Sequence, residues 1–275
     1  MQLTPRYDGP VVLTISQPED PSVPLLRQRR RLGDVLAALT AEQWAAPSRC
    51  EGWSVQDVVA HLIGTNQYWA LSIGAGLDGE PTRYLASFDP VATPAQMVAP
   101  MRAQPFADVL AGYVESVEQL GKVVDRIDVT DWERLGEAPP GHVSLRAVAM
   151  HALWDAWIHE RDILLPLGLS QALEPDELAA CVRYAAAIAP TLRATTGAVR
   201  AGRLGIVARD PAVALVIECG DVVVVAEADP PDGVACISGD AVALIEGLTF
   251  REPFAHGLSP DDEWLLAGLD VVFDR

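Results

Sequence analysis

The spacing of apolar residues changes once along this chain of 275 residues, and the change separates two kinds of structure. Up to about residue 196, apolar residues recur at intervals of three and four, which is the period of an amphipathic helix. After Gly202 they come in short β-branched runs between turn residues, a pattern typical of strands. We therefore predict an α+β fold, with a mainly α N-terminal bundle followed by a small C-terminal α+β domain.

Helices are predicted over five stretches of the N-terminal part: residues 25–39, 54–73, 106–127, 144–167 and 174–195. Two capping boxes, Thr40 with Gln43 and Ser54 with Asp57, mark helix starts. The connections at residues 74–104 and 131–142 are rich in Gly and Pro, so we expect loops there and no strand anywhere within residues 106–165.

The C-terminal part alternates short strands with helices. Strands are predicted at residues 204–208, 212–219, 222–228, 234–237 and 271–273, and helices at 240–248 and 260–269. The predicted division is an N-terminal arm (1–22, with a possible strand at 11–15), a helical domain (23–198) and a C-terminal domain (203–275).

Charge and composition exclude some classes of partner. The net charge of −18 would repel nucleic acid and anionic lipid, so we expect neither a nucleic-acid nor a membrane partner. The N-terminus shows no signal-peptide pattern, and the four cysteines have no C-x-x-C spacing, so we expect a cytoplasmic protein with free thiols. No motif places a cysteine near the candidate site described next. Whether the protein is a monomer or a homodimer stays open.

Three residues on two of the predicted helices form a candidate metal site. Asp155 and His159 lie four residues apart, so they share one helix face, and His61 lies on another helix with an apolar face. Three ligands with an open fourth position are typical of a catalytic zinc site. Burying such groups is costly unless they are paired or bound to metal. A buried hydrogen bond from Asp155 to either histidine, without metal, is the structural alternative.

Further polar residues lie one turn away from these candidates. We interpret His151, four residues before Asp155, as a pocket residue, because the outer members of a three-turn stripe are ~12 Å apart. Asp57 and Asp162 are placed to orient a ligating imidazole, or merely to cap and solvate the helices.

Several stretches resemble one known family. Residues 39–48 (LTAEQWAAPS), 52–62 (GWSVQDVVAHL) and 157–163 (WIHERDI) resemble the mycothiol-dependent maleylpyruvate isomerase family of the DinB-like superfamily. Residues 239–251 resemble the family's smaller, sterol-carrier-like domain. The resemblance implies a DinB-like four-helix bundle that holds a divalent metal, usually zinc, through His, Glu and His. By position these become His61, Asp155 and His159, where Asp155 is one methylene shorter than the family's Glu.

The resemblance also implies a metal-dependent enzyme that uses a low-molecular-weight thiol, such as mycothiol, for isomerisation or S-transfer. The metal-bound thiol would be deprotonated and would attack a small electrophilic substrate. The alternatives are a non-catalytic protein that binds a small ligand, and a metal-dependent hydrolase on the same bundle. We expect residues 74–104 and 139–142 to frame the pocket over the metal. The predicted polar contacts to substrate are Arg83, Tyr84, Arg102 and His142.

Overall fold

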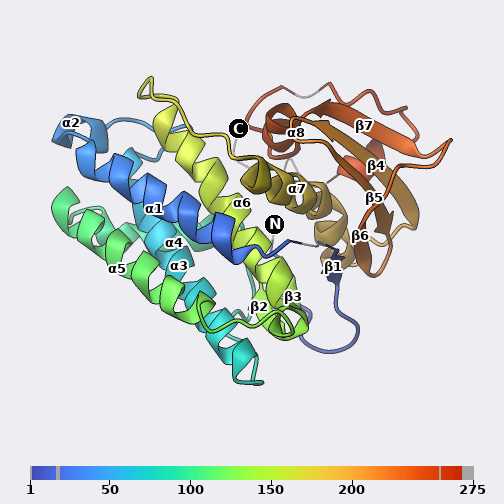
Figure 1. Cartoon of the computed structure of the whole chain (residues 1–275), viewed down its shortest axis with the longest axis horizontal. Coiled ribbons are helices and arrows are strands. Elements are labelled where there is room, and N and C mark those ends of the chain that lie inside the picture. Colours follow the sequence, from blue (N-terminus) through green and yellow to red (C-terminus); the bar gives the residue numbers. More distant parts are fainter. Residues whose placement is uncertain (1, 17–18, 254, 268–275) are drawn as a thin grey trace.

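The protein is described here by a computed structural model covering residues 2–16, 19–253 and 255–267. Its N-terminal part is helical and its C-terminal part combines a sheet with helices, so the predicted α+β class is confirmed. Four long helices pack against one another, with α1 and α3 each contacting both α5 and α6 (Figure 1). Their bounds are α1 (Ser22–Ala38), α3 (Val55–Leu77), α5 (Phe106–Val124) and α6 (Leu145–Leu164).

The two helices that carry the candidate ligands start at defined residues. The Ser54 side chain accepts from the Asp57 amide while the Asp57 carboxylate accepts from the Ser54 amide, which is the predicted capping box at the start of α3. At the start of α6, the Ser144 hydroxyl accepts from the Ala147 amide. A cap fixes where a helix begins, and the helical repeat then decides which residues face the neighbouring helix.

A mixed sheet of five strands forms the other half of the molecule, in the order β1-β6-β5-β4-β7. Its strands are β1 (Leu13–Ile15), β4 (Gly202–Arg209), β5 (Val213–Cys219), β6 (Val223–Glu227) and β7 (Ala235–Asp240). The three central strands are antiparallel neighbours, and the two edge strands pair in parallel with theirs. Because β1 belongs to the predicted N-terminal arm, that arm is bound to the C-terminal sheet.

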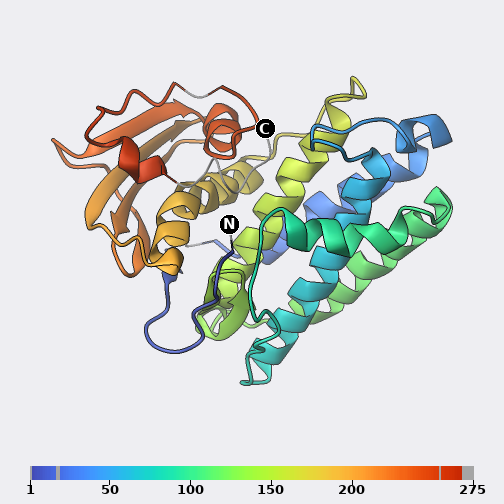
Figure 2. The ribbon, with the colours of Figure 1, turned by 180° about the vertical axis from the view of Figure 1, so that it is seen from behind.

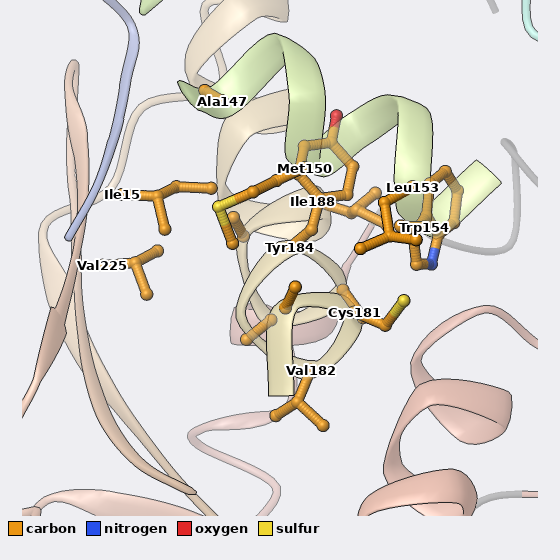
Figure 3. Close-up of a cluster of buried hydrophobic side chains, with 14 of the residues drawn as sticks. Ile15, Ala147, Met150, Leu153, Trp154, Cys181, Val182, Tyr184, Ile188 and Val225 are labelled. Atoms are coloured by element: carbon orange, nitrogen blue, oxygen red, sulfur yellow. The ribbon is translucent and has the colours of Figure 1, made fainter. Parts of the chain in front are cut away.

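Helix α7 (Pro175–Thr196) lies between the helical bundle and the sheet, where it contacts α6, β5 and β6 (Figure 1). In the resulting core, Met150 of α6 and Ile188 of α7 lie close together, with Ile15 and Val225 approaching from the sheet (Figure 3). Full burial of one such side chain contributes about 1.5–3 kcal/mol. The two halves therefore share one hydrophobic core.

A short hairpin interrupts the helical part, and it corrects one prediction. Strands β2 (Leu135–Ala138) and β3 (Gly141–Ser144) pair within a stretch that we expected to be a loop, so the expectation of no strand within residues 106–165 is wrong. The hairpin turns at Pro139-Pro140, and Gly141, which follows the turn, has a φ of +123° that favours glycine. The Ser72 hydroxyl on α3 bonds both backbone groups of Glu137, so a tertiary contact holds strands that have no apolar run of their own.

The remaining connections contain short helices. Residues 74–104 include α4 (Ala92–Val98) and the 3-10 helix η1 (Ala99–Met101), and α4 lies across α3 when the molecule is seen from behind (Figure 2). The other short elements are α2 (Ala41–Trp44), η2 (Asp131–Glu133), α8 (Ala241–Leu248) and η3 (Glu263–Leu266).

Only η3 represents the helix predicted over residues 260–269, and the strand predicted at 271–273 lies outside the described residues. Among the helices that the structure describes, none is long and apolar enough to cross a bilayer.

Candidate metal centre

The structure brings His61 of α3 together with Asp155 and His159 of α6. The Nε2 atom of His61 is 3.5 Å from Oδ1 of Asp155, and Nε2 of His159 is 3.6 Å from the same oxygen. The two imidazole rings are 4.8 Å apart and nearly perpendicular, at 75°. One ligand atom from each of the three residues lies within 4.8 Å of the other two.

These distances fit a bound divalent ion better than direct hydrogen bonds. They exceed the ~2.7–3.2 Å of an N–H···O bond. Tetrahedral zinc with bonds of ~2.0–2.2 Å separates its ligand atoms by roughly 3.3–3.6 Å. Both ring nitrogens of His61 and Oδ2 of Asp155 are buried and have no hydrogen-bond partner among the described residues. Burying polar atoms without a partner costs free energy. A cation between these groups would give a partner to buried atoms that have none in the protein.

The second nitrogen of His159 contacts a buried carboxylate. Nδ1 of His159 is 3.1 Å from Oδ2 of Asp162, and the Asp162 side chain is fully buried. A carboxylate there keeps the imidazole proton on Nδ1, which leaves Nε2 free to act as a ligand. Burial would raise the pKa of Asp162, but His159 and Arg251 together lower it to about 2. Asp162 therefore stays charged and occupies the orienting position predicted for it.

Without a metal ion, the pKa values of Asp155 and His159 each depend on the charges of their neighbours. Burial would raise the pKa of the Asp155 carboxyl, but the neighbouring His61 and His159 hold it below its ordinary value. Burial would lower the pKa of His159, yet Cys50, Asp162 and Asp155 together raise it to about 10. Metal binding at neutral pH must therefore release a proton from His159.

The carboxylate of Asp57, which could have oriented the His61 ring, forms its hydrogen bonds with other groups. Its carboxylate accepts from the Ser54 amide at 3.0 Å and from Nε of Arg102 at 3.0 Å. Neither nitrogen of His61 has a hydrogen-bond partner among the described residues. Of the two roles considered for Asp57, the structure therefore shows the capping role, because the capping box and Arg102 take up its carboxylate.

His151 lies in the pocket, as predicted, one turn before Asp155. Its Nδ1 is 2.7 Å from the hydroxyl of Tyr184, and its ring also packs against Trp69 and Trp154. Burial among these rings lowers the pKa of His151 to about 4, so this imidazole is neutral at physiological pH.

Two residues near the ligands carried no signal in the sequence. Sγ of Cys50 lies 3.6 Å from Nδ1 of His159 and 3.3 Å from Oδ2 of Asp162, so the expectation of no cysteine near the site is wrong. Arg251, from the segment after α8, donates to Asp162 at 3.0 Å and approaches Cys50 at 3.7 Å. Only tertiary packing brings these residues together, although Cys50 falls between the two family-like blocks at 39–48 and 52–62.

Cys50, His159 and Asp162 form a second cluster whose composition would suit a metal ion. In this cluster, however, the guanidinium of Arg251 already donates to Asp162 and lies beside Cys50. A positive charge supplied by the protein thus stands next to the cluster, which disfavours a second cation.

A cavity of about 330 Å³ opens beside the candidate ligands. It is bounded by α6, α7, the N-terminal arm, residues 88–95 and Pro139-Pro140, so both segments predicted to frame the pocket contribute to its wall. The four polar residues predicted to contact substrate do not line it. Arg83 pairs with Asp8, Arg102 with Asp57 and His142 with the Thr82 carbonyl, while Tyr84 is 71% exposed.

Comparison with known proteins agrees with this architecture. The family model described as "Mycothiol maleylpyruvate isomerase N-terminal domain" matches residues 25–164, about half of the chain, including all three candidate ligands. The chain belongs to this family.

Two solved structures are similar to this member of the family: a mycothiol-dependent maleylpyruvate isomerase and a histidine-to-alanine mutant of that enzyme, at 15% and 14% identity. In both comparisons the TM-score is 0.59, with 84% of this chain and 88% of the other covered, so the likeness extends beyond the N-terminal domain into the sheet. At this identity it establishes the fold alone. No curated protein sequence matches the chain.

Proposed function

We propose that the protein is a metal-dependent enzyme that uses a low-molecular-weight thiol to isomerise, or to transfer sulfur to, a small electrophilic molecule. Membership of a family named for a mycothiol-dependent isomerase supports a thiol-dependent isomerase. The observation that carries the metal dependence is the convergence of ligand atoms of His61, Asp155 and His159, where both His61 nitrogens and Oδ2 of Asp155 are buried without a hydrogen-bond partner among the described residues.

In this proposal, a divalent ion, zinc in the first instance, is held by Nε2 of both histidines and by the Asp155 carboxylate. Such an ion lowers the pKa of a thiol that coordinates it, so that the thiol is present as thiolate. The sulfur forms a bond to the electrophilic carbon of the substrate. For an isomerisation, the adduct rotates about the former double bond, the same carbon–sulfur bond breaks, and the thiol is returned unchanged.

The chain's own residues contribute orientation and an environment with little water. Asp162 holds the proton of His159 on Nδ1, and Arg251 stabilises the charge of Asp162 in turn. Because Arg251 follows α8, the C-terminal part supports a ligand that lies in the helical part. The largely apolar cavity excludes water from the reacting sulfur, and electrostatic interactions strengthen as water is excluded.

The first test is the metal content of the purified protein. We expect one equivalent of zinc in the wild type and a large loss in His61→Ala. His142→Ala is the matched control, because His142 is as buried as His61 (8% and 6% exposed) but bonds the Thr82 carbonyl. Equal metal content in the two variants would contradict the proposed ligand set.

The second test follows the thiol directly on cobalt-substituted protein. We expect small thiols, mycothiol among them, to produce a saturable sulfur-to-cobalt charge-transfer band that His159→Ala abolishes. A cobalt site that forms normally but shows no band with any thiol would argue against thiol chemistry. It would favour a metal-dependent hydrolase.

A non-catalytic, ligand-binding role is the second candidate, and the mainly apolar wall of the cavity is the observation that favours it. This role predicts stoichiometric ligand binding without thiol-dependent turnover. Measuring both properties on the same zinc-loaded sample separates the two functions.

A further inference from the structure

We propose that the substrate of this site is a small, uncharged and mainly apolar electrophile rather than a dianionic one. That the molecule in this cavity is a substrate rests on the proposed function. Its charge and polarity follow from the residues that line the cavity beside His61, Asp155 and His159.

The cavity is lined mainly by apolar side chains. Helices α6 and α7 contribute Trp154, Tyr184 and Ile188, which the close-up shows side by side between the two helices (Figure 3). The N-terminal arm and residues 88–95 contribute Leu3, Leu13, Phe88 and Val91. Burying a charged group against such walls is costly unless it is paired.

Apart from the proposed metal ion, whose open position the thiol takes, little positive charge is available to pair with a substrate carboxylate. Among the described residues that line the cavity, Arg251 is the only arginine or lysine, and it already donates twice to Asp162. His151 also lines the cavity, and burial among aromatic rings lowers its pKa to about 4, so it supplies no positive charge at neutral pH. Glu51 also lines the cavity, and the chain carries a net charge of −18, so the electrostatic field repels anions.

The size of the cavity and its few polar groups narrow the class of substrate further. About 330 Å³ equals the volume of roughly eleven waters, which suits a molecule of about ten non-hydrogen atoms. Two hydroxyls can recognise one polar group on it: Tyr184, already bonded to His151, and Thr191, which is buried and has no partner among the described residues. The oxygen of an ester or ketone, or the nitrogen of a nitrile, can form such a hydrogen bond without carrying a charge.

The test compares two unreactive ligands with the same carbon chain but different charge. A neutral fluorescent probe, N-phenyl-1-naphthylamine, is bound to the zinc-loaded wild-type protein and displaced by dimethyl succinate or by succinate. We expect the diester to displace it at a concentration at least about tenfold lower, because the metal ion can pair with one carboxylate of the dianion at most and the other must lose its hydration without gaining a cation. Equal or stronger displacement by succinate would overturn the inference.

A matched pair of variants tests the role of charge inside the cavity. Thr191→Lys adds a cation and Thr191→Met adds similar length without charge. We expect the methionine variant to keep the preference for the diester, and the lysine variant to shift it toward succinate by about tenfold. If the preference of both variants changes alike, charge does not decide selectivity and the inference fails. If the lysine variant does not fold, the wild-type competition still decides.

These measurements are separable from the test of the proposed function, because displacement of the probe needs no thiol. A preference for the diester without any thiol-dependent reaction would support the inference about ligand charge and contradict the proposed enzyme chemistry. Thiol-dependent isomerisation of maleate in preference to dimethyl maleate supports the enzyme chemistry and overturns the inference about substrate charge.

Discussion

Glu137 holds together the segment that closes one side of the cavity, and replacing it by glutamine tests that role. The Glu137 side chain is fully buried on hairpin strand β2. Its carboxylate accepts from the Tyr7 hydroxyl at 2.6 Å, the Thr82 hydroxyl at 2.5 Å, and the amides of Tyr84 and Leu85 at 2.8 and 2.7 Å. Burial would raise the pKa of Glu137, but these donors lower it overall, so the group is a carboxylate.

The expected cost of Glu137→Gln follows from this donor count. A glutamine side chain keeps one accepting oxygen and places an amide NH₂ group against donors. About half of the hydrogen bonds are therefore lost, and the others become neutral. Each donor left unsatisfied costs about 1–3 kcal/mol, and each loss of charge assistance costs about 1 kcal/mol. The sum is about 4–8 kcal/mol, a large part of the ~5–15 kcal/mol that stabilises a typical protein.

Calorimetry, which measures the Tm, and amide hydrogen exchange, which measures local opening, test this prediction. We expect Glu137→Gln to lower the Tm by roughly 8–30 °C. We also expect faster exchange at the Tyr84 and Leu85 amides than the global change explains. Glu133→Gln is the control, because Glu133 is exposed and forms a surface ion pair with Arg146, so its replacement should change stability by less than about 1 kcal/mol. Unchanged stability and unchanged exchange at these two amides would refute the reasoning.

Three further outcomes are expected. Asp162→Asn should weaken zinc binding by about 10–100-fold in a chelator competition, because the His159 proton is no longer held on Nδ1; unchanged affinity would mean that Asp162 does not orient the ligand. Because the pKa of His151 is about 4 when folded and 6.5 when unfolded, the unfolded chain binds more protons between these values. Stability of the metal-free protein should therefore fall as pH drops from 6.5 to 4, by at most about 3 kcal/mol from this group. His151→Phe should remove that part of the pH dependence in urea unfolding, and an identical pH profile would contradict the assignment. Gly141→Ala should fail to fold or lose much of its stability in thermal unfolding, because a Cβ there would lie 2.1 Å from the Arg6 carbonyl oxygen; a wild-type Tm would contradict it.

The sequence predicted the helices well because their signals are local. Apolar periodicity places the long helices, and the capping box at Ser54 marks the start of α3. Since residues four apart share a helix face, their spacing alone is enough to pair Asp155 with His159. The hairpin β2–β3 could not be predicted in the same way, because its strands are short and are held by Ser72 of a distant helix.

Sequence by itself determined the α+β class, the family and the residue types that can hold a metal at one end of the bundle. Tertiary structure alone decided that the rings of His61 and His159 lie 4.8 Å apart, and that Cys50 and Arg251 join them around Asp162. The physical reason is the range of each interaction: helix periodicity and caps act within a few residues, whereas these contacts join residues about 90 to 200 positions apart.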